Sequence, residues 1–176
     1  MNGEWQFEPS LNPDSTQFNG AWKSFSNSWA EEDETMAKIY IDVIGYRNFS
    51  IYIGSNSEQG YDYTVAMDPD IDPSYPPYDN EWEGRSEGVK ASTAENTWCD
   101  PTDLNTYVKV DYQLDGGHHI ICVVYRKDYS VSEGDDCGYL VIPKPTSTDN
   151  GIYLPDLDDT LYDEQHENEI ILEEEE

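Results

Sequence analysis

The fold is decided by AKIYIDVIGYRNFSIYIGSNSEQGYDYTVAM, residues 37–67, where apolar and polar side chains alternate on both sides of a Gly45-Tyr46 turn. In the run at 39–43, the two isoleucines and the valine share one face, and in the run at 49–53 the phenylalanine and both isoleucines do. A period of two places alternate side chains on opposite faces of a strand, so that one face can enter a core. We therefore predict two strands paired as a hairpin, followed by a third strand over 61–67.

A second hairpin is predicted from TYVKVDYQL at 106–114, which alternates, and HHIICVVY at 118–125, which is nearly continuous in apolar character. The Asp115-Gly116-Gly117 sequence between them is a hairpin signal. A continuous apolar run indicates a strand covered on both faces. Three further elements are expected: a strand within 21–29, a short helix over 89–98 and a last core strand at 137–143.

These elements predict an all-β protein, an antiparallel β-sandwich of jelly-roll type with about eight strands. The 176 residues fit one domain with extensions. We expect an N-terminal arm at 1–20, the sandwich at 21–145 and an acidic C-terminal tail at 146–176. Removal of the arm and the tail is expected to leave a folded sandwich.

The charge is strongly negative, with 38 acidic and 9 basic residues and a net charge of −29. Nucleic acids and anionic membranes attract proteins through Lys and Arg, so neither is expected as a partner. No apolar run approaches the ~20 residues of a membrane span, and residues 1–15 lack the features of a signal peptide. After Pro145 there are 12 acidic and no basic residues, which leaves a net charge of −17 before it.

The two ends are predicted to make the main partner contacts. The arm has too few apolar residues for its own core, and each one left in water forfeits ~1.5–3 kcal/mol, so they should bury against a neighbour or their own domain. In the tail, an edge-pairing strand is expected at 169–173. The predicted partner-binding residues are Trp5, Phe7, Leu11 and Phe18 in the arm and Ile170, Ile171 and Leu172 in the tail.

A possible glycan-binding loop lies at 68–88, which holds four of the ten prolines and cannot form a helix or a central strand. Tyr75, Tyr78 and Trp82 stand there among carboxylates, and aromatic faces with acceptor oxygens suit a sugar ring. A loop folded on its own aromatic side chains is the preferred interpretation.

A calcium site is considered because Asp68, Asp70 and Asp72 have the spacing that begins a calcium loop. A proline stands where such a loop needs glycine, and no Glu follows at the twelfth position, so this is not an EF-hand. A site of another type, sharing one of the first two residues with Asp135 or Asp136, stays an alternative. No other metal or cofactor is expected.

No catalytic signature is present. Glu58, Asp62, Glu81 and Glu83 could supply the carboxylate pair of a glycosidase, but among 38 acids such a pair arises by chance. No nucleophile setting such as G-x-S-x-G occurs. We expect a protein without enzymatic activity.

The cysteines and histidines give no metal pattern. Cys99, Cys122 and Cys137 are odd in number and lack C-x-x-C spacing, so thiols are expected, with a Cys99–Cys137 disulfide as the alternative. His118 and His119 are adjacent on a predicted strand and should point to opposite faces, which argues against zinc.

Two stretches, GYRNFSIYIGSNSEQGYDYTVAMDPD and HHIICVVYRKDYSVSEGDDCGYLVIP, resemble a β-sandwich module of gut-bacteriophage structural proteins, including those of crAss-like phages, and of surface proteins of their Bacteroidetes hosts. The resemblance covers roughly residues 38–143. Its marks are an aromatic-Ser-Ile-Tyr-Ile strand, a Glu followed by Tyr-Asp-Tyr, and Tyr-Arg-Lys-Asp ahead of Glu-Gly-Asp-Asp, here at 49–53, 58–63, 125–128 and 133–136.

The resemblance implies a structural or attachment protein of a virion, for example a head decoration, fibre or tail component, whose partners are other virion proteins in an oligomer or large assembly. It implies no catalytic residue. A virion protein made in the host cytoplasm agrees with reduced cysteines and no signal peptide. The alternative is a carbohydrate-binding module that recognises cell-surface or dietary glycans outside the cell.

Overall fold

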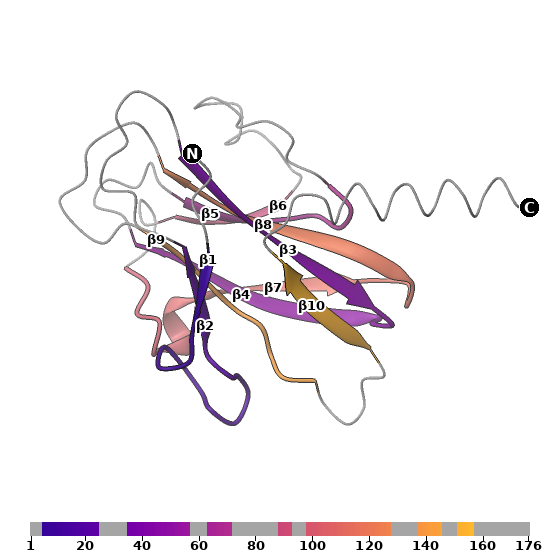
Figure 1. Cartoon of the computed structure of the whole chain (residues 1–176), viewed down its shortest axis with the longest axis horizontal. Helices are drawn as coiled ribbons and strands as arrows, with labels where there is room; N and C mark the ends of the chain where they lie inside the picture. Colours follow the sequence, from indigo (N-terminus) through magenta and orange to yellow (C-terminus); the bar gives the residue numbers. More distant parts are fainter. Residues whose placement is uncertain are drawn as a thin grey trace, which may run out of the picture.

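The computed structural model describes residues 5–24, 35–56, 63–71, 88–92, 98–127, 137–145 and 151–156. These residues form a two-layered β-structure with one short 3-10 turn (Figure 1). The elements are β1 (Trp5–Glu8), β2 (Ala21–Ser24), β3 (Thr35–Ile44), β4 (Asn48–Asn56), β5 (Tyr63–Met67), β6 (Gly88–Ser92), η1 (Leu104–Thr106), β7 (Val108–Gln113), β8 (His118–Lys127), β9 (Cys137–Val141) and β10 (Ile152–Asp156).

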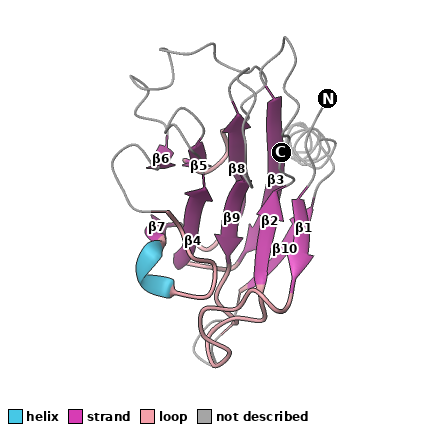
Figure 2. Ribbon diagram, turned by 90° about the vertical axis from the view of Figure 1, so that its left-hand side faces the viewer, coloured by secondary structure: helices cyan, strands magenta, loops and turns pink. Residues whose placement is uncertain are grey.

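The strands make two five-stranded antiparallel sheets, which we call the β4 sheet (β1-β2-β9-β4-β7) and the β8 sheet (β10-β3-β8-β5-β6) (Figure 2). Strands β2–β9 form a jelly roll, because β2 pairs with β9, β3 with β8, β4 with β7 and β5 with β6. β1 and β10 extend the two sheets on the same side of the sandwich. The predicted fold class is confirmed.

Both predicted hairpins are wrong. β3 and β4 lie in different sheets, as do β7 and β8, so each short turn is a corner between the sheets. Gly45 and Gly116 supply φ values of 84° and 86° at these corners. The corners pair with each other: the Gly45 N–H donates to the Gly117 carbonyl at 3.3 Å, and the Gly116 N–H donates to the Tyr46 carbonyl at 3.1 Å. Turn residues predict a reversal of the chain, but not which sheet the next strand joins.

The core lies between the two sheets and is built by the predicted alternation. Ile39, Ile41 and Val43 of β3 point into it with Ile51 and Ile53 of β4. β8 is buried on both faces, as its continuous apolar run predicts: Ile121 and Val123 enter the core. Its opposite face adds Ile120, Cys122 and Val124 to a second buried cluster, with Tyr40, Tyr63, Val65 and Met67.

The short helix predicted over 89–98 is contradicted in its first half. Residues 88–92 form β6, which pairs antiparallel with β5, so that Ala91 lies opposite Thr64. Pairing with β5 therefore overrides the helix propensity of Lys90 and Ala91. The strand predicted within 21–29 is confirmed by β2, and the one at 137–143 by β9, although β10 follows β9 in the described chain.

Parts of both ends belong to the sandwich. β1 pairs with β2 over its whole length, with Trp5 opposite Ser24. The loop at 9–20 folds back, held by Lys144, whose backbone N–H donates to the Gln17 carbonyl at 2.7 Å and whose Nζ donates to the Ser15 carbonyl at 2.9 Å. β10, within the predicted tail, pairs with β3. The division into arm, sandwich and tail thus does not follow the described strands.

Candidate functional site

The four predicted contact residues of the arm lie in different environments. Trp5 is buried in the core between the sheets, with 2% of its surface exposed. Phe18 is fully buried on the outer face of the β4 sheet, where its ring packs edge-on against Tyr52 at 5.6 Å between centroids and Leu11 joins the same cluster. Phe7 alone of the four is exposed, at 37%. Trp5 and Phe18 therefore bury against their own domain, and Phe7 is available to a partner.

Phe7 forms one wall of an aromatic groove of about 200 Å³. The groove lies where the β1–β2 edge of one sheet meets β10 of the other. The rings of Phe7 and Trp22 are 5.4 Å apart, and the Tyr153 hydroxyl donates to the Pro143 carbonyl at 3.0 Å, which fixes the tyrosine. The groove is lined by Phe7, Asn19, Gly20, Trp22, Ile142 and Tyr153.

Local sequence places each ring, but the groove itself needs the tertiary structure. Phe7 and Trp22 are register partners on β1 and β2, so their side chains share one face. Tyr153 comes from the opposite sheet. Trp22, Ile142 and Tyr153 were not predicted as site residues, because no local pattern shows that the edges of two sheets lie together.

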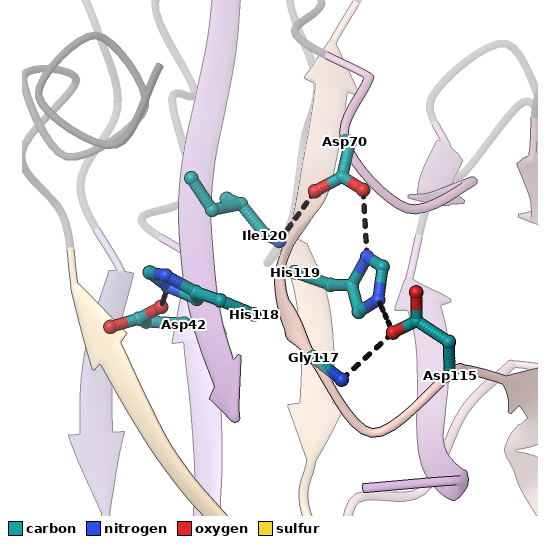
Figure 3. Close-up of polar contacts among 7 residues, drawn as sticks. All are labelled: Asp42, Asp70, Asp115, Gly117, His118, His119 and Ile120. Carbon is teal, nitrogen blue, oxygen red and sulfur yellow. Dashed lines mark hydrogen bonds and ion pairs between the residues drawn. The ribbon is translucent and has the colours of Figure 1, made fainter. Parts of the chain in front are cut away.

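A cluster of histidines and carboxylates lies at the paired corners (Figure 3). His118 and His119 point to opposite sides of β8, as predicted, and His118 pairs with Asp42 of β3. His119 is held between two carboxylates: its Nδ1 lies 2.8 Å from Asp70 Oδ2 and its Nε2 lies 2.7 Å from Asp115 Oδ1. The cluster thereby joins the β7–β8 corner to the turn that follows β5.

The geometry favours the charged form of His119. A carboxylate only accepts hydrogen bonds, so both ring nitrogens must carry protons to donate to Asp70 and Asp115. Burial alone lowers the pKa of His119, but the hydrogen bonds and negative charges of the two aspartates outweigh it and raise the pKa above the ordinary value of 6.5. Asp70 is held as well by the Ile120 N–H, which donates to its Oδ1 at 2.9 Å.

Replacing His119 by glutamine is expected to remove a stabilisation that depends on pH. Because the folded-state pKa of His119 is raised, its contribution is complete below the ordinary value of 6.5 and is lost as pH rises through the folded-state pKa. Asp115 is largely exposed and Asp70 partly so, and solvent therefore screens both pairs; we expect a loss of at most about 1 kcal/mol at low pH, mainly from the Asp70 pair. Urea unfolding of both proteins at pH 5.5 and pH 8.5 measures this difference.

Asp115 sets the lower pH limit of the same stabilisation. The His119 hydrogen bond, then that of the Gly117 N–H, lowers the pKa of Asp115 from 3.8, so its contribution is lost only as pH falls through that lowered pKa. His118→Gln is the control, because it leaves the His119 pairs intact. This variant should still lose stability as pH rises above 6.5. A stability difference between wild type and H119Q that stays constant with pH contradicts the charged-histidine geometry.

A second hollow, of about 240 Å³, carries positive charge. It lies between β4 and the chain that follows β9. Lys109 and Lys144 are two of only nine basic residues in the sequence. The lining is Tyr46, Asn48, Phe49, Ser50, Tyr52, Lys109, Pro143 and Lys144. We call it the lysine hollow.

The structure provides no assembled metal centre within its described residues, where no three His, Cys, Asp or Glu side chains group to hold an ion. Asp70 is engaged by His119 and Ile120, and Asp68 is also described but belongs to no such group. Asp72, Asp135 and Asp136 lie outside the described residues, so the alternative calcium site stays a prediction. The three cysteines are buried thiols. Burial raises the pKa of the Cys99 thiol to about 12, so it stays protonated and poorly nucleophilic.

Several predicted residues lie outside the described part of the chain. These are the possible glycan-binding residues Tyr75, Tyr78 and Trp82, the tail residues Ile170, Ile171 and Leu172, and the carboxylates Glu58, Asp62, Glu81 and Glu83. Their roles stay predictions.

Comparisons of the chain with protein-family models, with curated proteins and with solved structures find no match. Within the described residues, no helix has the length and apolar character needed to cross a membrane.

Proposed function

We propose that this protein is a non-enzymatic structural or attachment component of a bacteriophage virion and that it works through protein–protein contacts made at the aromatic groove. The observation that carries the proposal is the exposed Phe7 ring beside Trp22 and Tyr153, at a place where both sheets end. Aromatic side chains in a concave site, already held by their own packing, are typical of the few residues that dominate binding energy.

The fold is compatible with this role without assigning it. Jelly rolls build viral capsid domains and also lectin domains, and one fold serves many functions. The setting in a virion is supported by the resemblance of residues 38–143 to phage β-sandwich modules. A net charge of −29 favours partners with basic surfaces over nucleic acid.

The test is incorporation into the particle. We expect purified particles to contain the chain and Phe7→Ala to reduce its incorporation at least about tenfold, since a central aromatic anchor contributes about 2 kcal/mol or more to binding. A photo-crosslinking amino acid at position 7 should join the chain to a protein of the particle, either a different virion protein or a second copy of this chain. Mass spectrometry of the cross-linked band identifies the partner.

Trp98→Ala is the matched control, because Trp98 is an aromatic residue with 50% exposure that does not line the groove. This variant should be incorporated normally. Absence of the chain from particles, or equal loss with both variants, refutes the proposal. Binding to a glycan array that is lost with Phe7→Ala, without any virion cross-link, would instead establish the carbohydrate-binding alternative, for which rings beside the Asn19 amide are suitable chemistry.

A further inference from the structure

The aromatic groove and the lysine hollow are neighbours. Ile142 lines the groove, and the next two residues, Pro143 and Lys144, line the hollow. The two sites are also joined by side chains: the ring of Phe49, in the hollow, lies 5.7 Å from that of Tyr153, in the groove. An apolar, aromatic site and a cationic site therefore lie next to each other, and residues 142–144 contribute to both.

The charge of the hollow contrasts with that of the whole chain. Lys109 has 52% of its side chain exposed, and its Nζ is 3.4 Å from Asp111 Oδ1, so the ammonium retains donors for a further acceptor. Lys144 uses its Nζ to hold the Ser15 carbonyl at 2.9 Å and likewise has donors to spare. The Ser50 hydroxyl at the site already donates to Asp111 Oδ1 at 2.6 Å, so the donors offered to a ligand are the two lysine ammonium groups and the Asn48 amide. These groups suit a ligand that presents several carboxylates.

One segment of this chain has the matching order of chemistry. Ile170, Ile171 and Leu172 are followed directly by Glu173–Glu176. In an extended conformation these seven residues span about 23 Å at roughly 3.3 Å per residue. Residues 142–144, which line the two sites, cover much less, so such a segment is long enough to place its apolar part at the groove and its acidic part at the hollow.

We propose that the groove and the lysine hollow together form a docking surface for the acidic C-terminal segment, residues 170–176, of a second copy of this chain. The apolar triplet contacts Phe7 and Trp22, and the glutamates pair with Lys109 and Lys144. This inference rests on the proposed function, because it names the partner that occupies the aromatic groove. The surface and the segment are different parts of the chain, so the contact is head-to-tail and builds rings or filaments.

The direction of β10 favours a second copy over the same chain. β10 begins beside the Gly45 corner, with Ile152 opposite Ile44, and ends with Asp156 opposite Tyr40. It therefore carries the chain about 13 Å away from the end of the sandwich where Tyr46 lines the hollow, at roughly 3.3 Å per residue. The last described residue, Asp156, thus lies at the end of β10 that is away from the hollow.

Exchange of charge between two chains tests the contact. Salt dependence alone is ambiguous, because copies with a net charge of −29 also repel each other and salt screens both effects. We therefore compare three full-length proteins by sedimentation velocity at about 0.15 M ionic strength. They are the wild type, Lys109→Glu, and the double variant Glu174→Lys/Glu175→Lys.

The wild type is expected to self-associate with rising concentration. Each variant alone should associate at least about tenfold more weakly, because like charges then meet at the hollow. An equimolar mixture of the two variants should restore association, since the unchanged tail of Lys109→Glu meets the unchanged hollow of the double variant, and the reversed tail meets the reversed hollow. Lys23→Glu, the same charge change at a lysine that lines neither site, should associate like the wild type.

Two outcomes overturn the inference: a wild type that stays monomeric at all concentrations, or a mixture that associates no better than its components. Docking in the same chain would give the first of these. If either occurs while position 7 still cross-links to another virion protein, the proposed function stands and only the identity of the partner is wrong. If the cross-link is also missing, both fail.

Discussion

Replacing Trp5 by alanine is expected to lower the free energy of unfolding by about 3–5 kcal/mol, the usual cost of emptying a large aromatic site in a core. Trp5 is 2% exposed and packs among residues of both sheets, although it lies four residues from the N-terminus. Urea unfolding should show a lower midpoint with an unchanged slope. The effect is large because the surrounding β-sheets cannot collapse into the space left by an indole ring.

Phe7→Ala is the matched control on the same strand. Because Phe7 is 37% exposed, we expect it to cost only about 1 kcal/mol while it removes the proposed contact. Equal destabilisation by the two substitutions would show that β1 is not seated as described. The burial of Trp5 and Phe18 also leads us to expect that removing residues 1–19 destabilises the sandwich, contrary to the expectation from sequence.

The second large effect is expected at a polar contact buried between the sheets. Ser55 of β4 and Thr64 of β5 are 4% and 0% exposed. The Thr64 N–H donates to Ser55 Oγ at 2.8 Å, and Ser55 Oγ also lies 2.8 Å from Thr64 Oγ1 and 2.9 Å from the Ala91 carbonyl. One hydroxyl thus connects β4 with both β5 and β6. Few other polar side chains reach this depth in the described residues.

Ser55→Ala should therefore lower the free energy of unfolding by about 2–3 kcal/mol, because it leaves the buried Thr64 N–H without this acceptor. Ser50→Ala makes the same chemical change on the same strand. Ser50 faces outward and bonds to Asp111, whose side chain is 68% exposed, so its loss should stay within about 0.5 kcal/mol. A Ser55 variant as stable as the Ser50 variant would contradict the buried contact. Thermal and urea unfolding at neutral pH provide the comparison.

The residues that form most strands, and the faces that these strands bury, are predictable from the amino-acid sequence alone. The alternation at 39–43 and 49–53 places the same side chains in the core that the structure does, and the continuous run at 118–125 predicts a strand covered on both faces. These properties are local, because a strand's side-chain period of two does not depend on its neighbours. The all-β class followed from them, whereas the jelly-roll topology is established by the strand pairing.

The pairing of strands, in contrast, depends on the three-dimensional fold. β3 pairs with β8 and not with β4, because closing a core between two sheets requires the chain to cross at the Gly45 and Gly116 corners. A turn sequence does not distinguish such a corner from a hairpin. The same closure brings Phe7, Trp22 and Tyr153 together from three strands. It also places Asp70 and Asp115 on the two nitrogens of His119, across 45 residues of chain. Contacts between residues so far apart depend on the packing of whole sheets, which no local pattern in the sequence contains.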